Sequence, residues 1–169
     1  MSNTELPGEL NANLTKLTDL AKQREDLKTT AINALKGTLQ QLLKDIPELD
    51  GVRWAQYGPG FNDGDPCLFR VCELEVKFAG LSDEDNDKLE DNYESNGESE
   101  GYAPLDDQID ILQYAELKKN YGDNLFKYLE KVQEMIKGLE DCCQSAFGDN
   151  ARVVVTRSGI EVEDYDCGY

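Results

Sequence analysis

The chain has 169 residues, of which 35 are acidic, 17 are basic and none is histidine, so its formal net charge is −18. This length fits one domain, and a hydrophobic content of 39% supplies a modest core. A surface this acidic repels phosphate, so we expect no direct binding of nucleic acid. The lack of histidine excludes Ser-His and Cys-His nucleophiles and His-containing metal sites.

Motifs for catalysis, membranes and secretion are also missing. The sequence has no glycine-rich phosphate loop and no serine nucleophile elbow, so we expect neither enzymatic activity nor a cofactor or metal centre. No apolar run approaches the ~20 residues of a membrane span, and residues 1–10 do not resemble a signal peptide. Five cysteines without a C-x-x-C pair are typical of reduced thiols, which indicates a cytoplasmic protein.

Residues 9–46 are predicted to form one long helix, because they contain no proline and their apolar residues recur at steps of three and four. The pattern forms two rows of coiled-coil spacing. The first row is Leu10, Leu14, Leu17 and Ala21, and the second is Ile32, Leu35, Leu39, Leu42 and Ile46. Pro47 ends the helix. Thr29, Thr30 and Gly37 are weak points within it, at which a break is the alternative.

A β hairpin follows, with strands predicted at 52–57 and within 67–78, where apolar residues alternate. The connection between them is rich in Gly, Pro, Asn and Asp, which are turn formers. It also carries Asp63 and Asp65. Two carboxylates this close could bind a divalent cation, although a simple turn between strands uses the same residue types.

Residues 82–107 are strongly acidic, with eleven acids against a single base, Lys88. Ser82 and Asp85 match a capping box, which favours a short helix, whereas the following serine- and glycine-rich stretch has the composition of disorder. We therefore treat 82–104 as a partly disordered or short-helical acidic insert in a single domain spanning 1–169.

A second long helix is predicted from about Leu105 or Gln113 to Phe147. Its apolar row consists of Leu125, Leu129, Val132, Ile136, Leu139 and Cys143. A second hairpin, with strands at 153–156 and 160–165, follows it. The predicted fold is thus α+β, in the order α-ββ-α-ββ. Two long helices pair as an antiparallel hairpin beside a four-stranded antiparallel sheet.

The stretch from Trp54 to Val71, WAQYGPGFNDGDPCLFRV, resembles a short motif in uncharacterised acidic proteins encoded by tailed bacteriophages. The resemblance covers only the first hairpin, and no functional residue carries over with it. It implies a phage origin and action in the host cytoplasm. Small phage proteins of this acidity resemble DNA mimics or inhibitors of host defence.

These observations favour a non-enzymatic acidic binding protein that occupies the basic site of a host nucleic-acid-processing or defence protein. Its expected partner-binding residues are the carboxylates of the insert and the C-terminal tail. They are Asp83, Glu84, Asp85, Asp87, Glu90, Asp91, Glu94, Glu98, Glu100, Glu161, Glu163, Asp164 and Asp166. The alternative is a structural or assembly protein that forms a homodimer through its helices, with the insert only solubilising it.

Overall fold

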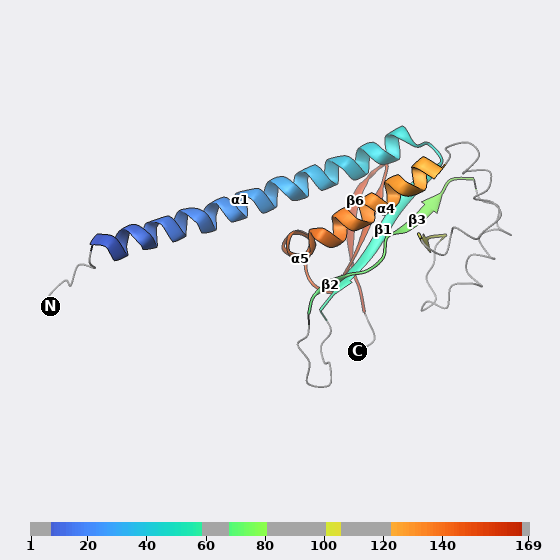
Figure 1. Ribbon diagram of the computed structural model, residues 1–169. Coiled ribbons are helices and arrows are strands. Elements are labelled where there is room, and N and C mark those ends of the chain that lie inside the picture. The colour runs from blue at the N-terminus through green and yellow to red at the C-terminus, as the bar shows by residue number, and fades with distance from the viewer. Residues whose placement is uncertain (1–7, 59–67, 81–100, 106–122, 167–169) are drawn as a thin grey trace.

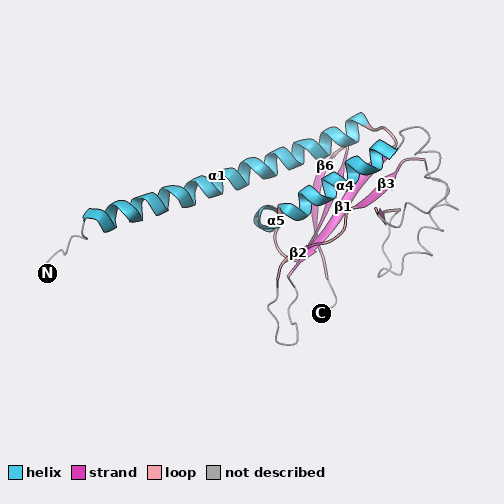
Figure 2. Ribbon diagram, viewed as in Figure 1, coloured by secondary structure: helices cyan, strands magenta, loops and turns pink. Residues whose placement is uncertain are grey.

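The computed structural model describes residues 8–58, 68–80, 101–105 and 123–166. In this part of the chain, three helices accompany one antiparallel sheet, and the first helix extends far beyond that sheet (Figure 1). The mixed α+β class predicted from the sequence is therefore confirmed. Figure 2 shows the strands gathered at one end of the long helix.

Helix α1 spans Gly8–Asp45 without a break. Threonine hydroxyls within the helix form hydrogen bonds with the preceding turn. The Thr30 Oγ1, for example, donates to the Asp26 carbonyl at 2.9 Å, so Thr30 does not interrupt the helix. The second of its two apolar rows is buried in the core from Ile32 to Leu42, whereas Ile46, just after the helix, is half-buried. Arg157 fastens the end of α1 to the sheet, because its guanidinium donates to the carbonyls of Leu43, Pro47 and Leu49 at 2.6–3.2 Å.

The sheet has the strand order β4-β3-β1-β5-β6, and β2 also pairs with β1. Its strands are β1 (Leu49–Tyr57), β2 (Arg70–Val71), β3 (Glu75–Phe78), β4 (Ala103–Pro104), β5 (Ala151–Thr156) and β6 (Gly159–Asp164). Every pairing is antiparallel. Both predicted hairpins are present, and they join where β1 pairs with β5.

The prediction of four strands needs correction in two places. The predicted strand within 67–78 is divided into β2 and β3. Side chains of the helices accept hydrogen bonds from the backbone N–H groups near this division. The Gln133 Oε1 accepts from the Leu74 N–H at 2.9 Å, and the Glu140 Oε1 accepts from the Val71 N–H at 3.1 Å. In addition, β4 forms at the end of the segment predicted as an acidic insert and pairs with β3.

The second long helix, predicted from about Leu105 or Gln113 to Phe147, is also corrected over its described part, and residues 106–122 lie outside the described residues. The structure divides it into α4 (Asp123–Gly138) and α5 (Glu140–Phe147) at Leu139, directly after a glycine that favours a helix less than other residues do. The amides of Cys142 and Cys143 both donate to the Leu139 carbonyl, at 2.9 and 2.8 Å, which starts the new helix. Helix α1 packs mainly on α5, so the predicted pairing of two long helices holds only in part.

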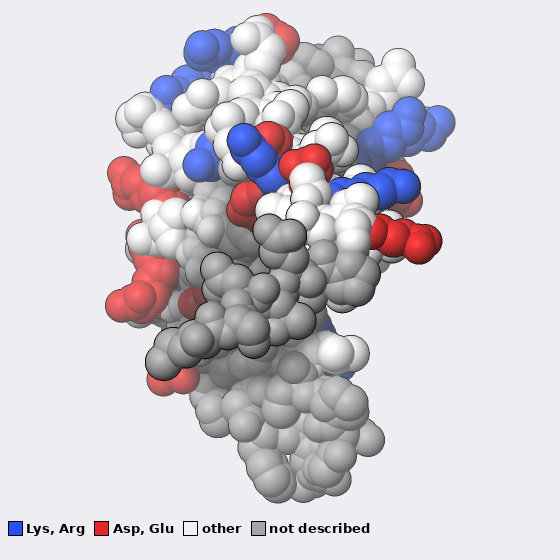
Figure 3. Space-filling model, turned by 90° about the vertical axis from the view of Figure 1, so that its left-hand side faces the viewer, with Lys and Arg blue, Asp and Glu red and all other residues white. Residues whose placement is uncertain are grey.

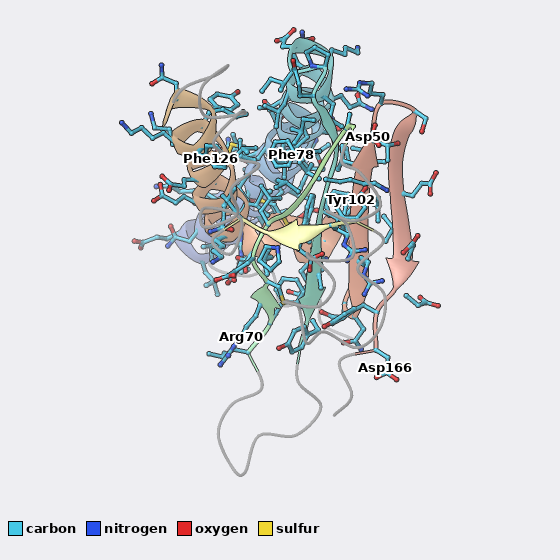
Figure 4. All side chains as sticks on the ribbon, turned by 90° about the vertical axis from the view of Figure 1, so that its right-hand side faces the viewer. Asp50, Arg70, Phe78, Tyr102, Phe126 and Asp166 are labelled. Carbon is cyan, nitrogen blue, oxygen red and sulfur yellow. The ribbon has the colours of Figure 1, made fainter. Side chains whose placement is uncertain are left out.

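The core lies between the helices and one face of the sheet. Alternate residues of the strands point toward the helices, among them Val52 and Trp54 of β1. The Trp54 ring meets Phe147 of α5 edge to face, with centroids 5.7 Å apart. Phe126 of α4 and Phe78 of β3, labelled in Figure 4, belong to the same cluster.

Candidate protein-binding surfaces

Four of the thirteen carboxylates expected to bind a partner lie in described residues, and all four are exposed. Glu161, Glu163 and Asp164 belong to β6, and Asp166 lies just beyond it. The other nine expected residues, in 83–100, lie outside the described residues, as do Asp63 and Asp65. Of the expected partner-binding residues, the structure therefore places the four carboxylates of the C-terminal tail, which lie on β6 and directly after it.

Strand β6 is the last strand in the described sheet order and forms its edge (Figure 4). Glu163 lies opposite Arg152 of β5, and Glu161 lies opposite Val154. The Arg152 guanidinium is itself stacked 5.5 Å from the centre of the Tyr165 ring. The edge is thus acidic, with the Arg152 guanidinium beside it. Charged side chains at a sheet edge also prevent unwanted pairing with strands of other molecules.

Among the described residues, a row of exposed apolar side chains lies on α1, over the part that we call the arm, residues 8–23. Its leucine row, which consists of Leu10, Leu14 and Leu17, is 45%, 44% and 62% exposed, and Leu20 beside the row is 50% exposed. Leu14 and Leu17 lie about five helical turns before the buried Ile32 and Leu35, so the exposed and buried rows lie on the same face of one continuous helix. The sequence pattern identified this row but predicted a helix partner for it.

The body begins where α1 reaches the α4–α5 junction. There the Arg24 guanidinium and the Asp141 carboxylate are 3.5 Å apart, with both side chains more than 70% exposed. An open groove beside this ion pair is lined by Leu20, Leu27 and Leu139, among others. The pair is too exposed to contribute much stability.

A second cluster of charged side chains lies on the sheet face away from the helices. Arg53 of β1 is 2% exposed and forms an ion pair with Glu75 of β3, its cross-strand neighbour. The Tyr102 ring, which is labelled in Figure 4, covers the guanidinium at 4.4 Å, and Lys77 approaches the same ring. Gly51 leaves room for the Tyr102 hydroxyl, which a Cβ would meet. The cluster is packed shut, so it supports the fold rather than a ligand.

Two of the described cysteines, Cys72 and Cys143, are not activated for chemistry. Burial raises the pKa of the Cys143 thiol to about 12, and burial also raises the pKa of Cys72. A thiol of this kind is protonated at neutral pH and is a poor nucleophile. Among the described residues, no group of three or more acidic or cysteine side chains is placed to hold a metal ion.

Comparison with known proteins adds no relative. No protein-family model matches the chain, and neither a curated protein nor a solved structure matches it. Within the described residues, no helix combines the length and apolar character needed to cross a membrane. Two surfaces therefore remain for a functional argument: the leucine row of the arm and the acidic edge at β6.

Proposed function

We propose that this protein is a non-enzymatic assembly protein whose arm joins the body to another helix. The observation that carries the proposal is the leucine row of the arm, which lies on the core-facing side of α1 beyond the end of the core. Helices in proteins gain most of their stability from packing an apolar face. In a solvated spacer, polar side chains would suffice at these positions, whereas coiled-coil spacing is the pattern that packs against a second helix.

The arm also has the physical character of an assembly element. Its charges cancel, since Glu9 and Asp19 are balanced by Lys16 and Lys22 in a chain whose net charge is −18. A partner that docks on the arm therefore avoids most of the electrostatic repulsion that acidic chains exert on one another. In Figure 3, which views the molecule from the side of the arm, acidic and basic side chains are interspersed.

The proposal is tested by changing Leu10, Leu14 and Leu17 together to serine. These side chains are exposed and lie outside the core, so we expect the free energy of unfolding of the body to change by less than about 0.5 kcal/mol. Sedimentation of a C-terminally labelled chain, in buffer and in extract of the producing cells, should show larger complexes for the wild type only. Identical profiles for the two proteins in both media would refute the assembly function.

The exposed carboxylates of β6 favour a second candidate function, which is binding of a basic protein at the sheet edge. A strand or peptide rich in Lys and Arg could pair with this edge and meet Glu161 and Glu163. This is the acidic binding protein expected from the sequence, and a phage-encoded DNA mimic or inhibitor of a host protein is its most specific form.

Salt dependence distinguishes the two functions. Binding through carboxylates should weaken steeply from 0.1 to 1 M salt, because the Debye length falls from ~10 Å to ~3 Å, and DNA should compete for the basic partner. Changing Glu161, Glu163, Asp164 and Asp166 to their amides should then abolish capture of that partner. The serine changes in the arm should leave that capture intact, so a loss caused by them instead would contradict the edge as the binding surface.

A further inference from the structure

We propose that the arm pairs with the arm of a second copy of this chain, as a two-stranded antiparallel coiled coil centred between Leu14 and Leu17. The inference rests on the proposed assembly function and identifies the partner, the orientation and the register. The length of the apolar row, the charges along it and the side chains at its flanks support this pairing.

The length of the apolar row sets the register. The row runs from Leu10 to Ala21, and the next two positions of the same spacing are Arg24 and Lys28, so its apolar part ends at Ala21. It covers ~17 Å of helix at ~1.5 Å per residue. Two antiparallel rows that overlap over this whole length bring residue 10 of one arm opposite residue 21 of the other.

This overlap also pairs apolar side chains in every layer. Leu14 lies opposite Leu17 of the partner subunit, and Leu10 lies opposite the partner's Ala21. The two-fold symmetry repeats both layers. A register shifted by one heptad toward the bodies would instead set Arg24 and Lys28 against leucines of the other arm. The register in which the two apolar rows overlap fully is therefore the one that the residue pattern favours.

The charges favour the antiparallel orientation. In a parallel pair the leucine row would continue into Arg24 and Lys28, each facing its own copy across the seam, and like charges in that position repel. A parallel pair would also bring the two bodies together at the same end of the coiled coil, where they would crowd each other. The antiparallel pair places the bodies at opposite ends.

The flanks of the seam carry no charge that would oppose a second copy. Asn13 and Leu20 lie on one side of the leucine row, and Asn11 and Thr18 lie on the other. The Thr18 Oγ1 donates to the Leu14 carbonyl at 2.9 Å within its own helix, so its hydroxyl needs no partner across the interface. On one side Glu9 comes near Arg24 of the partner subunit, an attractive combination. A neutral seam of this kind suits an identical arm better than it suits a strongly basic partner.

A charge exchange across one layer tests both the partner and the register. Leu14→Glu and Leu17→Lys, each in the full chain, should weaken the homodimer roughly 100-fold or more, because each symmetric dimer contains the buried charge twice. When the two variants are mixed, the carboxylate at position 14 meets the ammonium at position 17, and the other central layer stays leucine against leucine. Sedimentation equilibrium should then show a heterodimer within about 10-fold of the wild-type affinity.

Leu27→Glu is the matched control. Leu27 is 69% exposed on the same helix but lies off the leucine row, so this change should leave the dimer affinity unaltered. A wild-type chain that stays monomeric at its highest soluble concentration overturns the inference. So does a mixture that fails to restore association. If the triple-serine variant still loses a complex in extract while the pure wild type is monomeric, the assembly function stands and the second copy is wrong.

Discussion

Replacing Gln56 with leucine is expected to lower the free energy of unfolding by about 3–5 kcal/mol, because this side chain joins the central strand to the end of α5. Gln56 is 0% exposed. Its Nε2 donates to the carbonyls of Cys143 and Gly148, at 3.1 and 2.5 Å, and its Oε1 accepts from the Trp54 indole N–H at 3.2 Å. Leucine has a similar volume but leaves these three groups without that partner. Urea unfolding followed by tryptophan fluorescence measures the loss.

Gln144→Leu is the control for this change. The Gln144 amide also forms a hydrogen bond, to Asp149 at 2.9 Å, but the pair is exposed to water. Its loss should cost less than about 0.5 kcal/mol, since water replaces the bond. If the two variants unfold at the same urea concentration, Gln56 does not hold α5 against the sheet.

Neutralising Glu75 is the second substitution for which we expect a large loss, about 3 kcal/mol for Glu75→Gln. The change removes the carboxylate that faces the guanidinium of Arg53, whose burial beneath Tyr102 keeps water from replacing it. The double variant with Arg53→Met should recover much of this loss, because no buried charge then remains. Thermal unfolding of the two single variants and the double variant gives the coupling free energy directly.

The ion pair between Arg157 and Asp50 provides a comparison at the surface. Its atoms are 3.2 Å apart, and the side chains are 42% and 47% exposed. Asp50→Asn should therefore cost no more than about 0.5 kcal/mol. Equal losses at Asp50 and Glu75 would show that burial does not strengthen the Arg53 pair.

Periodicity predicted the elements well, because it reports which side of an element is apolar. The continuous helix α1, the buried row from Ile32 to Leu42 and both β hairpins follow from residue spacing alone. The same spacing could not reveal that the row from Leu10 to Ala21 is exposed. Exposure depends on where the rest of the chain packs, and the break at Leu139 turns α5 across α1 rather than extending the pairing along it.

Polar residues that hold the fold left no comparable signal. A glutamine in a strand and an arginine in a turn are unremarkable in sequence, yet Gln56 and Arg157 bind backbone carbonyls far away in the chain. Their partners are set by tertiary structure, which local spacing does not encode. For the candidate site, composition correctly indicated that the acids of the tail are exposed, but the arm became a candidate surface only once the extent of the core was known.

The central position of β1 has a consequence for how the protein is made. Its Gln56 bonds to groups 87 and 92 residues further along the chain, and β5, its neighbour in the sheet, follows them. A ribosome adds residues at roughly 5–20 per second, so about 5–20 s pass before β1 can complete its sheet. During that interval the helix that precedes β1 is already made, while the apolar side of β1 has no final cover. Such long-range pairing slows folding, and it makes the nascent first half of the chain the stage most exposed to aggregation and to chaperones.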